Sequence, residues 1–560
     1  LEEYVAPQTE VEKQLAEIWR EVLEVDRVGL NDNFFEAGGD SIKAIQIASM
    51  LQKNNYSINV NEIMQHSTIK KISPHIKSTE NNISQHKVTG QIPLTPIQTE
   101  FLKSNIYTNK FNQSILLYSN EKIKGSIFKQ VMKILIEHHD SLRIKFKYTK
   151  SKWKQINHED TENVFALSQH NLKSRKNVIK AIKETANVSH SSLNIETGPL
   201  MKLDIFDTIN GTYILIICHH LLIDGVSWRI LIEDLEDIYN SISEGNDVEL
   251  PLKTNSFLDW SIRLRDYSKN EKLESEIDYW KNICSNSFPP ITSSQNIKSS
   301  IYLDSKDKSF SLTDNQTTSL LFNTNHVYNT EINDILLTSL ALSLQEHLES
   351  YKVGCFLEGH GREEIFEDIN LNRTIGWFTS CFPVVFDFTF LNERDTKENK
   401  LPLYIKSVKE TIRKIPNRGL GYGVLRYLKE DVEFDRIEKK IPIVFNYLGQ
   451  FDAPNKRNNK TFKLESIRTG DSIHPKVNKK YIIEINSFVL NNQFHLITTY
   501  NSKLLNEDFV DKLNHSFRKN LINIIEHCSN ALKSELTPSD LGDANLSLDE
   551  LEFIQNEIRK

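Results

Sequence analysis

The sequence is poor in cysteine and has no long apolar run, and both absences narrow its class. Its five cysteines are widely spaced, their count is odd, and no CxxC pair occurs. A disulfide framework is therefore not expected. The longest clean apolar runs, such as "YILIIC" at 213–218, are far too short to cross a bilayer. The simplest interpretation is a cytoplasmic protein with reduced thiols and no membrane segment.

The chain also lacks an excess of positive charge. The chain has 68 Lys and Arg against 75 Asp and Glu, a formal charge of −7, and its basic residues are scattered. This argues against a nucleic-acid binder. The opening "LEEYVAPQTE" has no initiator Met, basic n-region or apolar h-region, so we expect no signal peptide and a piece excised from a longer polypeptide. With 560 residues, about three or four folding units are expected.

Several catalytic signatures are missing, which leaves one histidine motif to explain. The chain has no HExxH, no GxSxG elbow and no P-loop, but "CHHLLIDGVSWRIL" at 218–231 follows an apolar, strand-like run. A histidine pair is more often satisfied polar packing than catalytic equipment. The functional interpretation that remains is an acid/base site, since His titrates near neutral pH. Asp224 is expected to pair with Arg143 or Arg373, because an unpaired buried carboxylate is costly.

The order of predicted elements divides the chain into five parts. Residues 1–78 have helical periodicity, and the polar stretch 79–91 is predicted to be a linker. Strand-like and helical runs then alternate, the pattern of an α/β protein, in two stretches, 92–265 and 266–536. The tail 537–560 is predicted to contain an amphipathic helix, which could dock a partner or cap the preceding part. The apolar face of this helix consists of Leu551, Ile554 and Ile558.

"FFEAGGDSIKAIQ" places Ser41 after two glycines and Asp40, at the start of a predicted helix. Free N–H groups and the helix dipole suit a phosphate ester there, although such a residue is more commonly only an N-cap. With the whole of 1–78, this stretch resembles the peptidyl carrier protein of nonribosomal peptide synthetases. The resemblance implies a four-helix bundle whose Ser41 carries 4′-phosphopantetheine. The Asp directly before this Ser, where other carriers have His, resembles the sequence of carriers that serve an epimerization domain.

The histidine motif "HHLLIDGVSW" is similar to the signature of the condensation-domain superfamily. That resemblance implies two lobes, each like chloramphenicol acetyltransferase, that form a V with a central tunnel, and it makes His220 the active histidine. The family's opening motif, here "PLTPIQTEFL", commonly has aromatic residues after its Gln, and this sequence keeps only Phe101. The other motifs follow in the family's order: "PLTPIQTEFL" at 93–102, "HHDSLR" at 138–143, "LEGHGREE" at 357–364, "NRTIGWFTSCFPVVF" at 372–386, "IPNRGLGYGVLRY" at 415–427 and "FNYLGQFD" at 445–452.

These downstream motifs resemble the epimerization branch, an isomerase that inverts a tethered L-aminoacyl or peptidyl thioester to give D-amino acid. Inversion needs a base to remove the Cα proton and an acid to return one on the other face. We expect Glu358 to face Cα, with a pKa raised by burial. His220 would be the second acid/base group or would stabilise the enolate oxygen. Supporting roles are predicted for His219 (holding the loop under His220), Asp224, Arg373, Asn446 and Tyr447.

Two other functions remain open at this point. A condensation domain that forms a peptide bond would use His220 without needing Glu358, and a non-catalytic carrier and docking scaffold would need neither. The resemblance implies an upstream adenylation domain, a phosphopantetheinyl transferase and a downstream condensation domain as partners, in antibiotic biosynthesis. No Cys/His cluster has metal-ligand spacing, so we expect no metal. The charge argues against nucleic acid, and the reaction needs no cofactor beyond phosphopantetheine.

Overall fold

The computed structural model describes residues 4–78, 83–161, 163–292, 300–391, 400–430, 434, 437, 440–451, 461–465, 467, 469–531, 533–542, 546–548, 550–551 and 553–554. The predicted linker at 79–91 and the predicted tail at 537–560 lie partly outside the described residues. Ile558 of the tail lies outside them altogether.

A small helical bundle forms the N-terminal unit, as the sequence predicts. Its helices are α1 (Glu10–Leu23), α2 (Ser41–Lys53), α3 (Val60–His66) and α4 (Ile69–Ile72), with a short antiparallel pair of strands, β1 (Tyr56–Ser57) and β2 (Lys77–Ser78). α1 starts after Thr9, whose hydroxyl forms a reciprocal capping box with Glu12. Leu15 and Trp19 on its apolar stripe are fully buried, so this unit has a core of its own.

The first α/β part contains two sheets. The larger has the strand order β14-β4-β9-β8-β7, made of β4 (Asn112–Ser119), β7 (Phe165–Asn171), β8 (Met201–Asp207), β9 (Thr212–His219) and β14 (Lys463–Leu464). The smaller has the order β3-β6-β5, made of β3 (Gly90–Ile92), β5 (Ile144–Thr149) and β6 (Lys152–Asn157). The helices of this part are α5 (Pro96–Ser104), α6 (Gly125–His138), α7 (Val178–His190) and α8 (Gly225–Glu244). Residues 214–218 of β9 are fully buried, which is typical of a central strand.

The second α/β part is built on one six-stranded sheet of order β10-β16-β15-β13-β11-β12. Its strands are β10 (Ser305–Ser311), β11 (Lys352–Gly359), β12 (Ser380–Asp387), β13 (Ile443–Gln450), β15 (Ile483–Leu490) and β16 (Gln493–Asn501). β13 pairs in parallel with both β11 and β15, while the other pairs are antiparallel. The helices are α9 (Phe257–Tyr267), α10 (Glu271–Glu274), α11 (Ile277–Ser285), α12 (Asp314–Phe322), α13 (Ile332–Leu348), α14 (Leu401–Arg413), α15 (Leu420–Gly423) and α17 (Glu507–Ser529).

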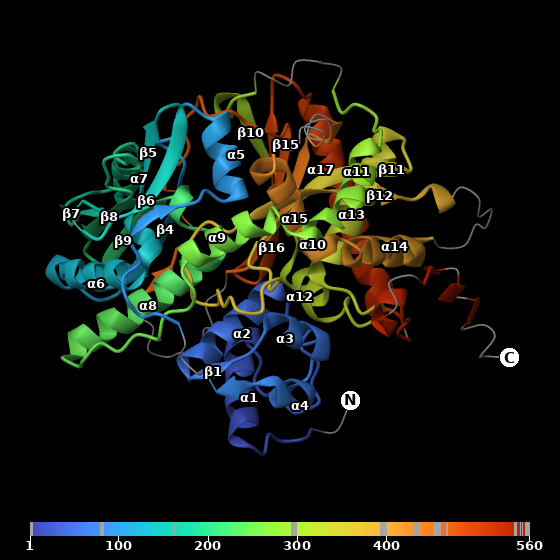
Figure 1. Ribbon diagram of the computed structural model, residues 1–560, viewed down its shortest axis with the longest axis horizontal. Coiled ribbons are helices and arrows are strands. Elements are labelled where there is room, and N and C mark those ends of the chain that lie inside the picture. Colours follow the sequence, from blue (N-terminus) through green and yellow to red (C-terminus); the bar gives the residue numbers. More distant parts are fainter. Residues whose placement is uncertain are drawn as a thin grey trace.

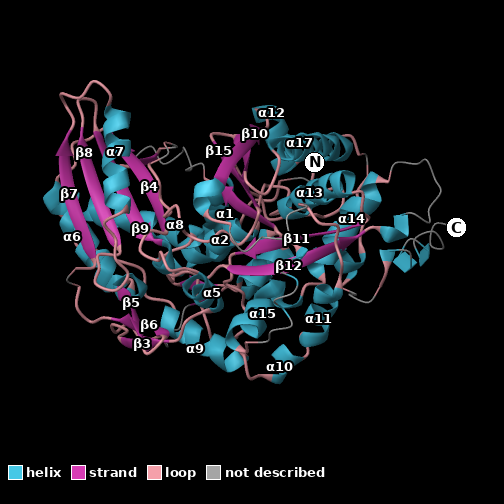
Figure 2. Ribbon diagram, turned by 90° about the horizontal axis from the view of Figure 1, so that it is seen from above, coloured by secondary structure: helices cyan, strands magenta, loops and turns pink. Residues whose placement is uncertain are grey.

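The two α/β parts lie side by side as separate lobes. In Figure 1 the larger N-terminal sheet is at the left, the six-stranded sheet at the right, and the helical bundle below them. Figure 2, from above, also shows the two sheets apart. β14 comes from the C-terminal half of the sequence but pairs with β4, so the chain crosses the boundary predicted at residue 265. A helical bundle followed by two α/β lobes confirms the predicted fold class.

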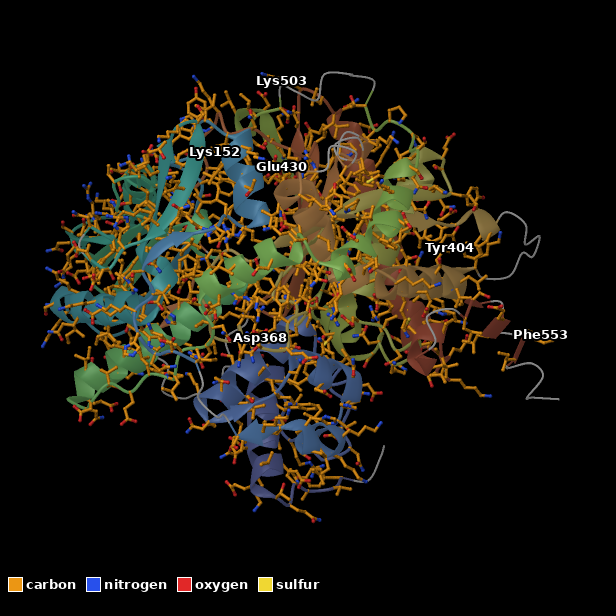
Figure 3. The ribbon with its side chains drawn as sticks, viewed as in Figure 1. Lys152, Asp368, Tyr404, Glu430, Lys503 and Phe553 are labelled. Atoms are coloured by element: carbon orange, nitrogen blue, oxygen red, sulfur yellow. The ribbon has the colours of Figure 1, made fainter. Side chains whose placement is uncertain are left out.

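The described part of the tail does not present one uniform apolar face. Leu551 is buried, whereas Phe553 and Ile554 are exposed, and Phe553 projects from the edge of the molecule (Figure 3). Among the described helices, none combines the length and apolar character that a bilayer crossing requires.

Candidate active site

The histidine motif lies where β9 ends and α8 begins. His219 is the last residue of β9 and is fully buried. Its Nε2 donates to the Thr108 carbonyl at 2.7 Å, and its Nδ1 accepts from the Leu221 N–H at 3.2 Å. Burial lowers the pKa of His219 to about 3. A neutral imidazole with both nitrogens bonded to backbone holds this loop in place.

His220 opens the short turn that follows and has different partners. Its Nδ1 lies 2.8 Å from the Ile223 carbonyl oxygen and its Nε2 lies 2.9 Å from Nε2 of Gln113. The ring stacks on Phe111 at 5.3 Å and contacts Trp377 at 4.4 Å between ring centroids. Burial lowers the pKa of His220 because a charged ring would be poorly solvated there. His220 is therefore neutral at pH 7.

Asp224 caps α8 and connects the two lobes. Its carboxylate accepts from the backbone and hydroxyl of Ser227, at 2.8 and 2.7 Å. Its ionic partner is Arg362, at 3.2 Å, from the loop after β11. The prediction of Arg143 or Arg373 as this partner was wrong. Arg362 forms this ion pair because its loop lies against the start of α8. There its guanidinium also donates to the Ser227 hydroxyl at 2.9 Å.

Glu358 is the next-to-last residue of β11, in the opposite lobe. One carboxylate oxygen accepts from the Asn446 side-chain amide at 2.6 Å. Burial, and then the negative charges of Glu484 and Glu100, raise the pKa of Glu358 to about 7, while Lys480 acts in the opposite direction. This agrees with the raised pKa that the sequence predicts. Such a carboxyl can take up and release a proton at neutral pH.

A pocket of about 120 Å³ opens between the lobes and the helical bundle. Its lining includes Glu358, Asn446 and Tyr447 from the second lobe, Asp224, Gly225, Val226 and Arg229 from the first, and Asp40, Ser41 and Ile42 from the bundle. Six of the predicted site residues are thereby brought to one place. His220 is not among the described residues that line this pocket, and its ring lies against Trp377 instead.

Ser41 lies in the first turn of α2 and lines this pocket. Asp40 is the N-cap of that helix and accepts from the Lys43 N–H at 2.8 Å, so the capping role and the site role coincide. Arg229 is an adjacent cation: it interacts electrostatically with Asp40 and donates to the Leu448 carbonyl at 3.2 Å. A cation beside free helix N–H groups fits a phosphate ester on Ser41.

Tyr447 provides a direct test of whether the pocket suits a bound arm. Its hydroxyl is buried and has no hydrogen-bond partner among the described residues, and burial raises its pKa well above the usual value. An orphaned buried hydroxyl is costly unless a ligand satisfies it. The pocket that starts at Ser41 thus offers a polar partner to the amides or ester of a phosphopantetheine arm.

Arg373 lies elsewhere, and its predicted role in orienting a thioester was wrong. Its guanidinium forms ion pairs with Glu233, at 2.9 Å, and with Asp234 of α8. It also donates to the Ser49 hydroxyl on α2 at 2.8 Å. Two carboxylates in a buried setting hold this cation more strongly than a neutral thioester would. Arg373 therefore contacts the docked bundle and not the pocket.

Sequence reasoning missed other contacts between the bundle and the lobes. Lys53, at the end of α2, pairs with Glu233 and Asp237, both at 2.7 Å. Glu364 accepts from the backbone N–H groups of Val60 and Asn61 at 2.7 and 2.9 Å. Glu364 is part of the "LEGHGREE" motif, so the motif could have indicated that this residue has a functional contact. Nothing in the local pattern around Lys53 points to a partner.

Among the residues that the structure describes, one cluster of potential metal ligands occurs, in the bundle and away from the pocket lining. Glu62, His66 and His75 bring one ligand atom each to within 4.8 Å of one another. A single oxygen of Glu62 lies 3.0 Å from His66 and 3.2 Å from His75, and the two rings stack at 4.3 Å. A carboxylate shared by two stacked rings accounts for their closeness.

Comparison with known proteins agrees with this geometry. A family model for the phosphopantetheine attachment site matches residues 13–76, and one for the condensation domain matches residues 88–547. The first match confirms the predicted covalent phosphopantetheine. The crystal structure of the epimerization domain from the third module of tyrocidine synthetase B is 34% identical, with a TM-score of 0.72, and the match covers 80% of this chain and 100% of that one.

Curated relatives match almost the whole chain. Bacitracin synthase 2 of Bacillus licheniformis and tyrocidine synthase 2 of Brevibacillus parabrevis are each 37% identical over 99% of this chain, which spans 21% and 15% of their lengths. Gramicidin S synthase 1 of Brevibacillus brevis is also 37% identical, and the chain spans 50% of it. The chain is thus much shorter than these relatives. It belongs to the condensation-domain superfamily of nonribosomal peptide synthetases, with a phosphopantetheine-binding carrier domain in front of the condensation-type domain.

Proposed function

We propose that the chain is a carrier–epimerization didomain that converts a tethered L-aminoacyl or peptidyl thioester into an L/D mixture. The observation that carries this proposal is Glu358, a carboxyl with a pKa of about 7 in the pocket that begins at Ser41. Peptide-bond formation does not need such a group, whereas proton transfer at Cα does. The likeness to the tyrocidine synthetase epimerization domain supports the same activity.

The proposed division of the chain follows the order of the folded units, although α9 (Phe257–Tyr267) runs across the boundary at 265 and β14 joins the sheet of the first lobe. Residues 1–78 are the carrier, 79–91 the linker, 92–265 and 266–536 the two lobes, and 537–560 the tail. Ser41 is the attachment residue, and when bound its phosphopantetheine supplies a flexible arm with a terminal thiol for the substrate. Arg229 and the first turn of α2 stabilise the phosphate charge, and the Tyr447 hydroxyl donates to a polar group of the arm.

The chemistry is carried by two groups on opposite lobes. The accepting Nε2 of neutral His220 takes the Cα proton, and the electron pair of the C–H bond moves into the thioester carbonyl to form an enolate. The protonated form of Glu358, held by the amide of Asn446, returns a proton to the opposite face to give the D form, and return of the proton from His220 to the same face gives back the L form. His220 is the second acid/base group. As a neutral ring whose Nδ1–H is bonded to Ile223, it has an accepting Nε2 and no free N–H for an enolate oxygen.

The wider assignment follows from the family. An upstream adenylation domain selects the amino acid, a phosphopantetheinyl transferase modifies Ser41, and a downstream condensation domain takes the product. The described tail residues are proposed to contact that downstream partner through the exposed Phe553 and Ile554.

The test is a loading assay in D₂O. Ser41 is loaded with an L-aminoacyl or dipeptidyl phosphopantetheine, and the released acid is analysed for chirality and Cα deuterium. We expect D product with Cα deuterium from the wild-type chain. The signal should be lost in Glu358→Gln and His220→Ala and kept in Glu367→Gln, an exposed carboxylate used as the matched control. Ser41→Ala should fail to load.

The same assay decides against the alternative. A condensation domain remains the second candidate, because the family model that matches residues 88–547 is the condensation domain. It would leave Cα unexchanged and would form an amide with a carrier-bound amine, with full activity in Glu358→Gln. No inversion and no exchange across several aminoacyl and dipeptidyl substrates would reject the epimerase.

A further inference from the structure

Gln113, on the strand next to the histidine motif, has its side-chain amide between two rings. It belongs to β4, which pairs with β9 so that Gln113 lies opposite Cys218. Its Oε1 accepts from the indole N–H of Trp228 at 2.8 Å. Its Nε2 lies 2.9 Å from Nε2 of His220. The reaction proposed above does not use this amide.

The hydrogen-bonding capacities of these groups fix the direction of every bond. An indole N–H can only donate, so the amide oxygen must face Trp228. The amide NH₂ must then face His220, and because it can only donate, Nε2 of His220 must be the acceptor. At the other end of the ring, the Ile223 carbonyl can only accept, so Nδ1 carries the hydrogen. The two ends of the ring independently require the same tautomer.

The surroundings leave the ring few other polar contacts. Phe111 and Trp377 pack against the ring, and an imidazole can form conventional hydrogen bonds only at its two nitrogens. The titratable groups that face it are His219 from β9 and Asp224 from the start of α8. His219 is neutral, and Asp224 is neutralised by Arg362. Gln113 is therefore the contact that sets the state of Nε2.

We propose that Gln113 is a positioning residue for His220, which it holds in the Nδ1–H tautomer with Nε2 reserved as the proton-accepting atom. The contribution of Gln113 to proton transfer rests on the proposed epimerase function. Its effect on the tautomer of His220 does not. A proton on Nε2 would point at the amide NH₂ and break this hydrogen bond, so Gln113 opposes premature protonation. A substrate that reaches Nε2 displaces the amide, which stays bonded to Trp228.

The test replaces the donor with an acceptor of the same shape. In Gln113→Glu one carboxylate oxygen still accepts from Trp228, while the other accepts from a protonated His220. Histidines are labelled with ¹³C at Cε1, the His220 resonance is assigned by its loss in His220→Gln, and its titration is followed in the full chain. In wild type we expect a midpoint below the usual value of about 6.5, and in Gln113→Glu an upward shift of about one to three units.

Two further variants keep the outcome decisive. Gln113→Met removes the donor at similar volume and should shift the midpoint upward by less than Gln113→Glu. Trp228→Phe frees the amide to turn its oxygen toward the ring, and should also raise the midpoint; it serves if Gln113→Glu fails to fold. Gln91→Glu, at an exposed site on β3, should change nothing. An unchanged midpoint in Gln113→Glu, or in Trp228→Phe if the former does not fold, overturns the proposal.

The pH profile of Cα exchange adds a readout that a purely structural role would not move. In folded Gln113→Glu the acid limb should move to higher pH by the same amount as the His220 midpoint, with slower exchange at pH 7. If the wild-type chain exchanges nothing, the epimerase proposal fails while the titration still decides the role of Gln113. If exchange occurs and its profile is the same in Gln113→Glu, the positioning role fails alone.

Discussion

At the scale of single residues, the proposed epimerization depends on two titratable groups whose surroundings shift their pKa values. Glu358 is buried near two other carboxylates, and this environment favours its neutral form. His220 is buried against aromatic rings and both its nitrogens are hydrogen-bonded, and this burial also favours the neutral form. Near pH 7, then, a half-protonated carboxyl and a neutral imidazole occupy opposite lobes. A neutral carboxyl can give a proton and a neutral imidazole can accept one, so the pair can supply both an acid and a base.

The charges around Glu358 predict a shift of the pH profile in two directions. Glu484 raises the pKa of Glu358 and Lys480 lowers it. Glu484→Gln should therefore move the alkaline limb of Cα exchange to lower pH, and Lys480→Met should move it to higher pH, each on the order of one pH unit. The measurement is exchange rate against pH for the loaded chain. Shifts of the same sign in the two variants would contradict this account of the carboxyl.

At the scale of elements, docking of the carrier depends on the contact between α2 and α8. Ser41 begins α2 and Lys53 ends it, so one helix both presents the arm and pairs with Glu233 and Asp237. Arg373 adds a bond from the second lobe to Ser49 on the same helix. Because the contacts lie along one rigid helix, they determine how Ser41 meets the pocket.

Reversing the charge of Lys53 should weaken docking without touching the chemistry. Partly exposed ion pairs contribute about 0.2–1 kcal/mol each, so loss of both pairs in Lys53→Glu should slow exchange of the tethered substrate about threefold to tenfold. A free aminoacyl thioester that reaches the pocket by diffusion should be exchanged at the wild-type rate. The double variant Lys53→Glu/Asp237→Lys should recover part of the loss. Equal slowing of tethered and free substrates would show damage to the pocket instead.

At the scale of the whole molecule, the lobes are joined by contacts between residues that lie far apart in the sequence. The resemblance implied the four-helix bundle, the two lobes and the buried setting that raises the pKa of Glu358. Local patterns predicted the helical N-terminal unit, the α/β stretches and the position of Ser41 on its helix. They could not predict that Asp224 pairs with Arg362, because 138 residues separate the two. Nor could they place Arg373 against α2 or show Trp377 over His220. Such contacts arise from packing between lobes, which no helix or strand period encodes.

The pair between Asp224 and Arg362 predicts the cost of separating the lobes. Both side chains are almost fully buried, and Arg362 also donates to the Thr374 carbonyl at 2.6 Å. Removing one partner strands a buried charge, so Asp224→Asn should lower the free energy of unfolding by about 3–5 kcal/mol, measured by urea denaturation. If the two side chains interact, the effects of changing them on the free energy of unfolding should not be additive. Adding Arg362→Met to Asp224→Asn should cost less than the sum of the single changes.

A matched surface pair supplies the control for this prediction. Arg263 and Asp368 form an ion pair in which both side chains are largely exposed, and Asp368 lies at the surface near the carrier (Figure 3). Asp368→Asn removes the same charge from the same kind of pair, and its effect should stay within about 0.5 kcal/mol. If Asp224→Asn cost no more than Asp368→Asn, the buried pair would not hold the lobes together. In that case the pocket between Glu358 and the start of α8 would have to be maintained by the apolar contacts alone.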